Sequence, residues 1–318
     1  MIMMLAAKHI GVPFIDYTKD GRIMAEAQLR TVEDYDLDCL MTCSDPAREV
    51  IDIAGEGSIE WLADQGPVIN EENAALLDKL RLREFRVPDP FGGGRMHDRI
   101  KAIEIMRREV GMEKSIVGWV EGPLALGAEL RGLNRIMMDF EDDEAFIDEL
   151  LAYCAEVAIR YAEAQIQAGA DTIGMSDAAA CMIGPDKYER FLHGHQQRVF
   201  GWIKEHYPHV LTRQHMCGQT NPLISKMREL PVDIYELDFP VDLSKAKLTL
   251  GERTISGNVS TVTTLLNGTP EAVYEAVRQC HKTCGRFFIA GAGCELSPMT
   301  PPENLRAFVQ AAKDARYN

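Results

Sequence analysis

Alternation of apolar, strand-like runs with helical stretches is the feature that most constrains the fold of this chain. Strands in the C-terminal half are expected at about residues 210–215, 232–237, 254–257 and 287–290. The last two helices begin at Thr269-Pro270-Glu271 and at Thr300-Pro301-Pro302-Glu303, where an N-cap residue precedes an early proline and an acid. Alternating strands and helices predict a parallel sheet with crossover helices.

The N-terminal half continues this alternation less regularly. Its strands are expected at about residues 1–5, 37–43, 115–120 and 171–175. A long helix is expected at 142–168, and glycine and proline breaks predict a short insertion or hairpin within residues 48–90. Eight strand–helix units in 318 residues predict a single (β/α)8 barrel of the TIM type over residues 1–318. An open doubly wound sheet is the alternative, but no glycine-rich turn follows the first expected strand.

Composition limits the partners and the compartment. The formal net charge of −15 disfavours nucleic acid and anionic membranes, which bind basic surfaces. No apolar run approaches the roughly 18 residues that cross a bilayer, and the N-terminus lacks the pattern of a signal peptide. The eight cysteines are therefore expected to be reduced thiols or metal ligands in a cytoplasmic protein.

Three potential metal ligands follow two of the expected strands. His215 and Cys217 are separated by one residue at the end of one strand, and Cys294 ends another, 77 positions after Cys217. Catalytic zinc favours imidazole and thiolate ligands, with three protein ligands and an open fourth position. The alternative is that both cysteines are buried thiols. That alternative leaves unexplained a histidine on the same strand face, so the pattern favours zinc.

Other polar residues also follow apolar strands. In a barrel the carboxyl ends of the strands converge on the active site, so Asp45, Glu121 and Asp177 are candidate catalytic residues and Asn258 a candidate cofactor-binding residue. Polar residues at strand ends are equally expected of ordinary loops. A second metal or redox pair at Cys280 and Cys284 is less favoured than helix packing, because the two lie four apart on an expected helix.

These residues resemble the uroporphyrinogen decarboxylase superfamily, and within it the zinc-dependent corrinoid methyltransferases, a branch that includes methylcobamide:coenzyme M methyltransferases. The resemblance covers nearly the whole chain. Its most specific part is the His-x-Cys motif with the distant final cysteine. The matching stretches are 122–124, 169–173, 214–218, 257–259, 267–273, 291–295 and 300–305.

The resemblance implies a barrel in which His215, Cys217 and Cys294 hold zinc and a substrate thiol takes the open position. A corrinoid (cobalamin-type) cofactor would arrive on a carrier protein that docks over the barrel mouth, and a homodimer is compatible with the family. The function implied is methyl transfer between that corrinoid and a small acceptor. The alternatives are a corrinoid-dependent demethylase, a uroporphyrinogen-type decarboxylase, or a binding protein with a structural zinc.

The sequence also departs from the family pattern. The arginine-rich N-terminal segment of the decarboxylases has no counterpart here, which favours methyl transfer over decarboxylation. The tyrosine that the family carries a few residues after Gly-Pro corresponds to Glu129, whereas Asp45 matches the family's central aspartate. Glu121 is not usual in the coenzyme M enzymes, so the acceptor is expected to differ.

Overall fold

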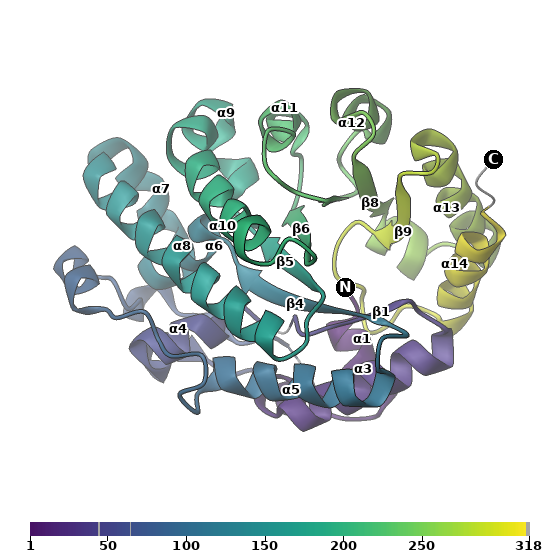
Figure 1. The fold of residues 1–318 in the computed structure, drawn as a ribbon, viewed down its shortest axis with the longest axis horizontal. Coiled ribbons are helices and arrows are strands. Elements are labelled where there is room, and N and C mark those ends of the chain that lie inside the picture. Colours follow the sequence, from purple (N-terminus) through teal and green to yellow (C-terminus); the bar gives the residue numbers. More distant parts are fainter. Residues whose placement is uncertain (44, 64, 316–318) are drawn as a thin grey trace.

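A parallel sheet of seven strands curls into the wall of a TIM-type barrel, with helices on its outer side (Figure 1). The computed structural model describes residues 1–43, 45–63 and 65–315. Each strand pairs in parallel with the next one in the sheet. In sheet order the strands are β1 (Cys39–Met41), β4 (Ser115–Glu121), β5 (Thr172–Ser176), β6 (Leu211–Met216), β7 (Ile234–Leu237), β8 (Thr254–Val259) and β9 (Phe288–Ala292).

Helices surround the convex side of this sheet (Figure 1). Within the described ranges, no helix is long and apolar enough to cross a membrane. The longer helices are α3 (Gly21–Tyr35), α5 (Arg95–Val110), α6 (Pro123–Arg131), α7 (Leu133–Asp142), α8 (Glu144–Gln167), α10 (His193–His206), α12 (Leu243–Leu250), α13 (Pro270–Cys284) and α14 (Pro302–Asp314). The shorter ones are α1 (Met3–His9), α2 (Phe14–Lys19), α4 (Ala47–Ala54), α9 (Gly184–Lys187) and α11 (Ile224–Met227).

The TIM-type fold is confirmed, but the expected count of eight strands is wrong. Residues 3–9 form the helix α1 where a first strand was expected, and its residues Leu5, Ala6 and Ala7 are buried. Three adjacent buried positions fit a helix that packs on a neighbour, and α1 lies against α3. Among the described residues β1 and β9 do not pair, so the sheet is open between them. The Met1 carbonyl accepts a hydrogen bond from the backbone N–H of Leu296 (3.1 Å) near this opening.

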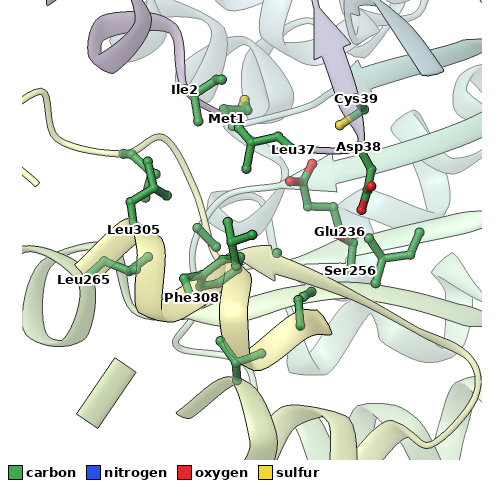
Figure 2. A pocket seen from close by; sticks show the side chains of 18 of the residues that line it. Met1, Ile2, Leu37, Asp38, Cys39, Glu236, Ser256, Leu265, Leu305 and Phe308 are labelled. Carbon is green, nitrogen blue, oxygen red and sulfur yellow. The ribbon is translucent and has the colours of Figure 1, made fainter. Parts of the chain in front are cut away.

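A cavity of about 400 Å³ lies along the open seam (Figure 2). Its wall is largely apolar, with Leu37 from the β1 side and Leu305 and Phe308 from α14. Glu236 and Ser256 reach it from the barrel interior. The seam therefore takes the place that an eighth strand would fill in a closed barrel.

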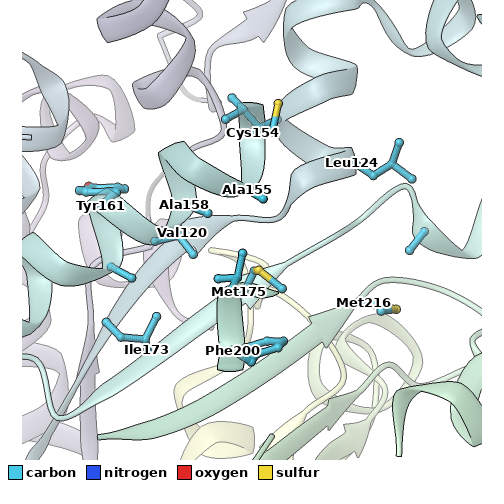
Figure 3. Packing of buried hydrophobic residues seen from close by; sticks show 14 of the residues in the cluster. Val120, Leu124, Cys154, Ala155, Ala158, Tyr161, Ile173, Met175, Phe200 and Met216 are labelled. Atoms are coloured by element: carbon cyan, nitrogen blue, oxygen red, sulfur yellow. The ribbon is translucent and has the colours of Figure 1, made fainter. Parts of the chain in front are cut away.

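The main core lies between the sheet and the helices outside it (Figure 3). Val120, Ile173 and Met175 point outward from β4 and β5 toward Ala158 on α8 and Phe200 on α10. Successive residues of a strand alternate between faces, so their neighbours point into the barrel. Trp119 fills that interior, and a Cβ on Gly174 of the adjacent strand would lie 2.3 Å from its ring.

The expected hairpin within residues 48–90 is confirmed. Strands β2 (Ile59–Glu60) and β3 (Val68–Ile69) pair antiparallel there, separately from the barrel sheet. The helix expected at 142–168 begins later, because Asp143 ends α7 and its side chain accepts a hydrogen bond from the N–H of Phe146 (3.1 Å) to start α8.

The side chain of Gln165 on α8 forms hydrogen bonds with backbone groups of β4 that lie beyond the end of the shorter strand β1. The pairing of β1 with β4 ends at Val117. Two residues further on, the Gln165 amide accepts a hydrogen bond from the N–H of Trp119 (2.8 Å) and donates one to its carbonyl (2.9 Å). The close approach requires Gly118, because a Cβ there would lie 2.9 Å from the amide oxygen.

We expect Gln165→Leu to lower the free energy of unfolding by about 2–4 kcal/mol. The buried N–H of Trp119 would lose its partner and its carbonyl would keep only the long hydrogen bond from Arg48 (3.5 Å), at roughly 1–3 kcal/mol for each group affected. Urea denaturation followed by circular dichroism measures the change. Gln167→Leu, at an exposed position of the same helix, is the control, and equal effects of the two changes would contradict this account of α8.

Candidate functional site

Three potential metal ligands converge at the carboxyl ends of β6 and β9. Nε2 of His215 lies 3.3 Å from Sγ of Cys217 and 3.9 Å from Sγ of Cys294, and the two sulfurs are 3.9 Å apart. Tetrahedral zinc, with bonds of about 2.3 Å to sulfur and 2.0 Å to nitrogen, separates its ligand atoms by roughly 3.6–3.8 Å. The three side chains therefore fit one zinc ion and leave its fourth position for another ligand.

Backbone features bring the two cysteines together. The Asp238 carboxylate, after β7, accepts hydrogen bonds from the N–H groups of Gly218 and Phe239, each at 2.7 Å. This holds the turn that follows Cys217. A Cβ on Gly293 would lie 2.6 Å from the nitrogen of Phe239. Only glycine lets the segment after β9 approach closely enough to present Cys294 to the other two ligands.

Hydrogen bonds within the cluster favour one thiolate. The hydrogen bond between the two sulfurs, in which either can be the donor, and a second one with His215 lower the pKa of Cys294 to about 4, although burial opposes the change. The hydrogen bond between the sulfurs raises the pKa of Cys217. A thiolate is the form of cysteine that binds a metal. The hydrogen bonds within the cluster therefore already favour the thiolate form that a metal ion requires.

A buried ion pair supports His215 from inside the barrel. Glu236 on β7 accepts a hydrogen bond from Nε of Arg213 (2.9 Å), and its carboxylate lies 3.6 Å from Nδ1 of His215. Burial raises the pKa of Glu236, but the charges of Arg213 and His215 outweigh it and bring the pKa to about 2. A carboxylate beside the second ring nitrogen orients a metal-binding histidine, with Nε2 left for the metal.

Sequence reasoning missed Arg213 and Glu236. Neither follows a strand, which was the signal used for candidate residues. Both face the barrel interior, where Glu236 lies directly opposite His215 in the register of β6 and β7. The register between β6 and β7 cannot be predicted from one sequence. The position of Arg213 two residues before His215, and so on the same strand face, is a signal that predicts it to point into the barrel.

Of the other predicted residues, two line the cavity and two form hydrogen bonds with the backbone next to it. Asp45 and Glu121 line a cavity of about 630 Å³ that also contains the three ligands. Asp177 and Asn258 are not among its described lining residues. Asp177 accepts hydrogen bonds from the N–H groups of Leu124 and Ala125 at the start of α6, both at 2.9 Å. Asn258 donates to the carbonyls of Asp238 (3.2 Å) and Val241 (2.8 Å).

Asp45 and Glu121 are each paired with an arginine. Arg95 binds both oxygens of Asp45, at 2.7 and 2.8 Å. Arg48, fully buried, lies 3.2 Å from Glu121 and 3.1 Å from Glu49. One guanidinium thus serves two carboxylates. Burial raises the pKa of Glu121 to about 8, with the attraction of Arg48 opposing and the charge of Glu49 adding to the rise.

Glu129, which sequence comparison noted only as a departure from the family, also lines the cavity. Burial raises its pKa to about 7, and the negative charges of Asp45, Glu49 and Glu71 add to the rise. A carboxyl group in this setting loses its proton near neutral pH. The cavity therefore combines a metal-ligand cluster with several carboxyl groups that are costly to ionise.

Comparison with known proteins assigns this arrangement to a family. The model of the uroporphyrinogen decarboxylase (URO-D) family matches residues 1–315. The chain belongs to this family. It is 33% identical to the methylcobamide:CoM methyltransferase MtbA of Methanosarcina mazei, over 80% of this chain and 74% of that protein. It is 30% identical to the methylcobamide:CoM methyltransferase MtaA of Methanosarcina barkeri, over 69% of this chain and 63% of the relative.

A solved structure gives the same result for the fold. A methyltransferase from Methanosarcina mazei superimposes with a TM-score of 0.89 at 25% identity, covering 98% of this chain and 90% of that one. The resemblance inferred from the motifs around residues 214–218 and 291–295 is thereby confirmed. The curled sheet of this URO-D family member is shared over nearly its whole length.

We expect Glu129→Gln to stabilise the protein at pH 8 but not at pH 4.5. Because the pKa of Glu129 is raised in the folded state, its stability contribution is complete below the unfolded pKa of about 4.5 and is lost as pH rises toward 7. The gain at pH 8 should be on the order of 2–3 kcal/mol by this linkage. Urea denaturation at the two pH values measures it.

Glu275→Gln, at an exposed position on α13, provides the control for charge removal. It should change the free energy of unfolding little at either pH. A gain in the Glu129 variant that is equal at pH 4.5 and pH 8 would contradict the raised pKa.

Proposed function

We propose that this chain is a zinc-dependent methyltransferase that moves a methyl group between a corrinoid on a carrier protein and a small acceptor, which we take to be a thiol. The observation that carries the proposal is the tetrahedral fit of His215, Cys217 and Cys294 inside the cavity at the barrel mouth. The names of the related methylcobamide:CoM methyltransferases support the reaction class.

His215, Cys217 and Cys294 would hold the zinc ion. When bound, zinc lowers the pKa of a thiol that coordinates it, which supplies a thiolate nucleophile at neutral pH. Glu236 keeps the imidazole of His215 in place, and Arg213 keeps Glu236 ionised. The ring centroid of Trp119, which is buried in the barrel interior, lies 6.4 Å from that of His215.

The proposed transfer forms a sulfur–carbon bond and breaks a cobalt–carbon bond. The acceptor sulfur attacks the methyl carbon, and the electron pair of the broken bond stays on cobalt, which changes from Co(III) to Co(I). The thiol proton leaves to solvent. The same residues would serve the reverse direction, in which a methylated small molecule is demethylated onto Co(I).

The cavity wall supports methyl transfer over decarboxylation of a polycarboxylate. None of the described residues that line it is a lysine or an arginine. The arginines near it, Arg48 and Arg95, are already bound to Glu49, Glu121 and Asp45. A substrate with many carboxylates would meet like charge and, among the described lining residues, no lysine or arginine to bind it, which costs binding energy. The hairpin residues Pro67, Val68 and Ile69 line the same cavity. We infer that the carrier protein docks at this mouth.

We expect purified protein to contain about one zinc per chain, and Cys294→Ser to lose most of it. Removal of one of three ligands should weaken zinc binding by at least tenfold, since changes even beyond the ligands cost 10–100-fold. Metal analysis by mass spectrometry measures the content. Methyl transfer from free methylcobalamin to a thiol, followed by cobalt absorbance, should fall in parallel.

Cys280→Ser is the matched control, because it removes a thiol from the Cys280–Cys284 pair on α13. It should leave zinc content and methyl transfer unchanged. Zinc-free protein that binds no added zinc, or full activity in the Cys294 variant, would overturn the proposed function.

A further inference from the structure

The cavity above the metal ligands has far more acidic than basic groups. Five carboxyl-bearing residues line it, and none of its described lining residues is a lysine or an arginine. Two of the five are matched, since Asp45 is bound by Arg95 and Glu121 shares Arg48 with Glu49. The lining carboxyl residues are Asp45, Glu71, Glu121, Glu129 and Glu295.

Two of these lining side chains have carboxyl oxygens without a partner in the described part of the chain. Within the described part of the chain, Glu129 makes no side-chain hydrogen bond and no ion pair, and it lies among the like charges of Asp45, Glu49 and Glu71. Glu295 accepts one hydrogen bond from the N–H of Met4 (3.0 Å), but its second oxygen is buried with no partner. Buried polar groups without partners are costly, so a bound group that satisfies them gains the difference.

A zinc ion bound by the two cysteines would not add net positive charge to the cavity. Two thiolates would balance a zinc ion at the cluster of Cys217 and Cys294, so the ion leaves no excess for the carboxylates. The positive groups near the cavity are Arg48 and Arg95, which are already bound to carboxylates, and the α-ammonium group of Met1, which acts on Glu295. The lining carboxyl groups outnumber them.

We propose that the cavity selects a substrate with a positively charged nitrogen, such as an aminothiol or a methylated amine, and disfavours an anionic thiol. This inference rests on the proposed function, because it names the substrate class of the same site. We assign the preference mainly to Glu129, because among the described lining carboxyl residues it is the one with neither a side-chain hydrogen bond nor an ion pair. It is a specificity-determining residue, whereas the three metal ligands are common to any thiol.

Three thiols of equal chain length test the charge preference. They are 2-aminoethanethiol (positive), 2-mercaptoethanol (neutral) and 2-mercaptoethanesulfonate, which is coenzyme M (negative). Calorimetry on the zinc-containing protein without corrinoid measures their dissociation constants at pH 7.5. We expect binding to weaken from the positive to the neutral to the negative thiol, with at least a tenfold difference between the ends of the series.

Methyl transfer from free methylcobalamin to the same thiols provides the second measurement. The ratio of kcat/KM between the positive and the negative thiol should follow the binding ratio. Glu129→Gln, which keeps the shape and removes the charge, should shrink both ratios about tenfold. Glu275→Gln on the exposed face of α13 should leave both ratios unchanged.

The outcomes separate the two proposals. Tightest binding of the sulfonate, or ratios that Glu129→Gln does not alter, would overturn the charge preference even if all three thiols are methylated. If the cationic thiol binds best and none of the three is methylated, the preference is supported and the methyltransferase proposal fails. Zinc content and circular dichroism of the Glu129 variant establish that it is folded and metal-loaded.

Discussion

Parallel pairing of all seven strands is the constraint on which the rest of this structure depends. Because every strand of the sheet runs in the same direction, all carboxyl ends meet at one mouth. The curl of the sheet then places the end of β9 beside that of β6, although 77 positions separate Cys217 from Cys294. The candidate metal-ligand cluster and the position of the cavity around it follow from this geometry, whereas the β2–β3 hairpin that borders the cavity forms a separate sheet.

Buried charge is organised in two layers around the mouth. Inside the barrel, Arg213 and Glu236 form a matched pair that holds His215. Around the cavity, Arg48 and Arg95 leave some carboxyl groups without a counter-charge, with Glu129 as the clearest case. The matched layer gives rigidity to the ligands. The unmatched layer costs stability, and that cost is expected where a charged substrate binds.

The sequence predicted those features that depend on chemical type or on local pattern. His215, Cys217 and Cys294 stood out because few other roles need an imidazole and two thiols at strand ends, and the structure brings their atoms within 3.9 Å. The helix α1 was mistaken for a strand because a short apolar run carries no clear period. Asp177 and Asn258 have the same local signature as Asp45 and Glu121. Yet Asp177 binds the first turn of α6 and the side chain of Gln196, and Asn258 binds the carbonyls of Asp238 and Val241.

The amino-acid sequence by itself determined the barrel class, the candidate metal ligands and the surplus of acid, since these follow from periodicity, from residue type at strand ends and from composition. Only the tertiary structure decided that the sheet stays open between β1 and β9, that Glu236 lies beside His215, and that Glu129 lines the cavity without an ion-pair partner among the described residues. The physical reason is that register and burial arise from contacts between distant segments. The sequence shows that a residue is acidic, but only the tertiary structure shows whether an arginine lies close enough to form an ion pair with it.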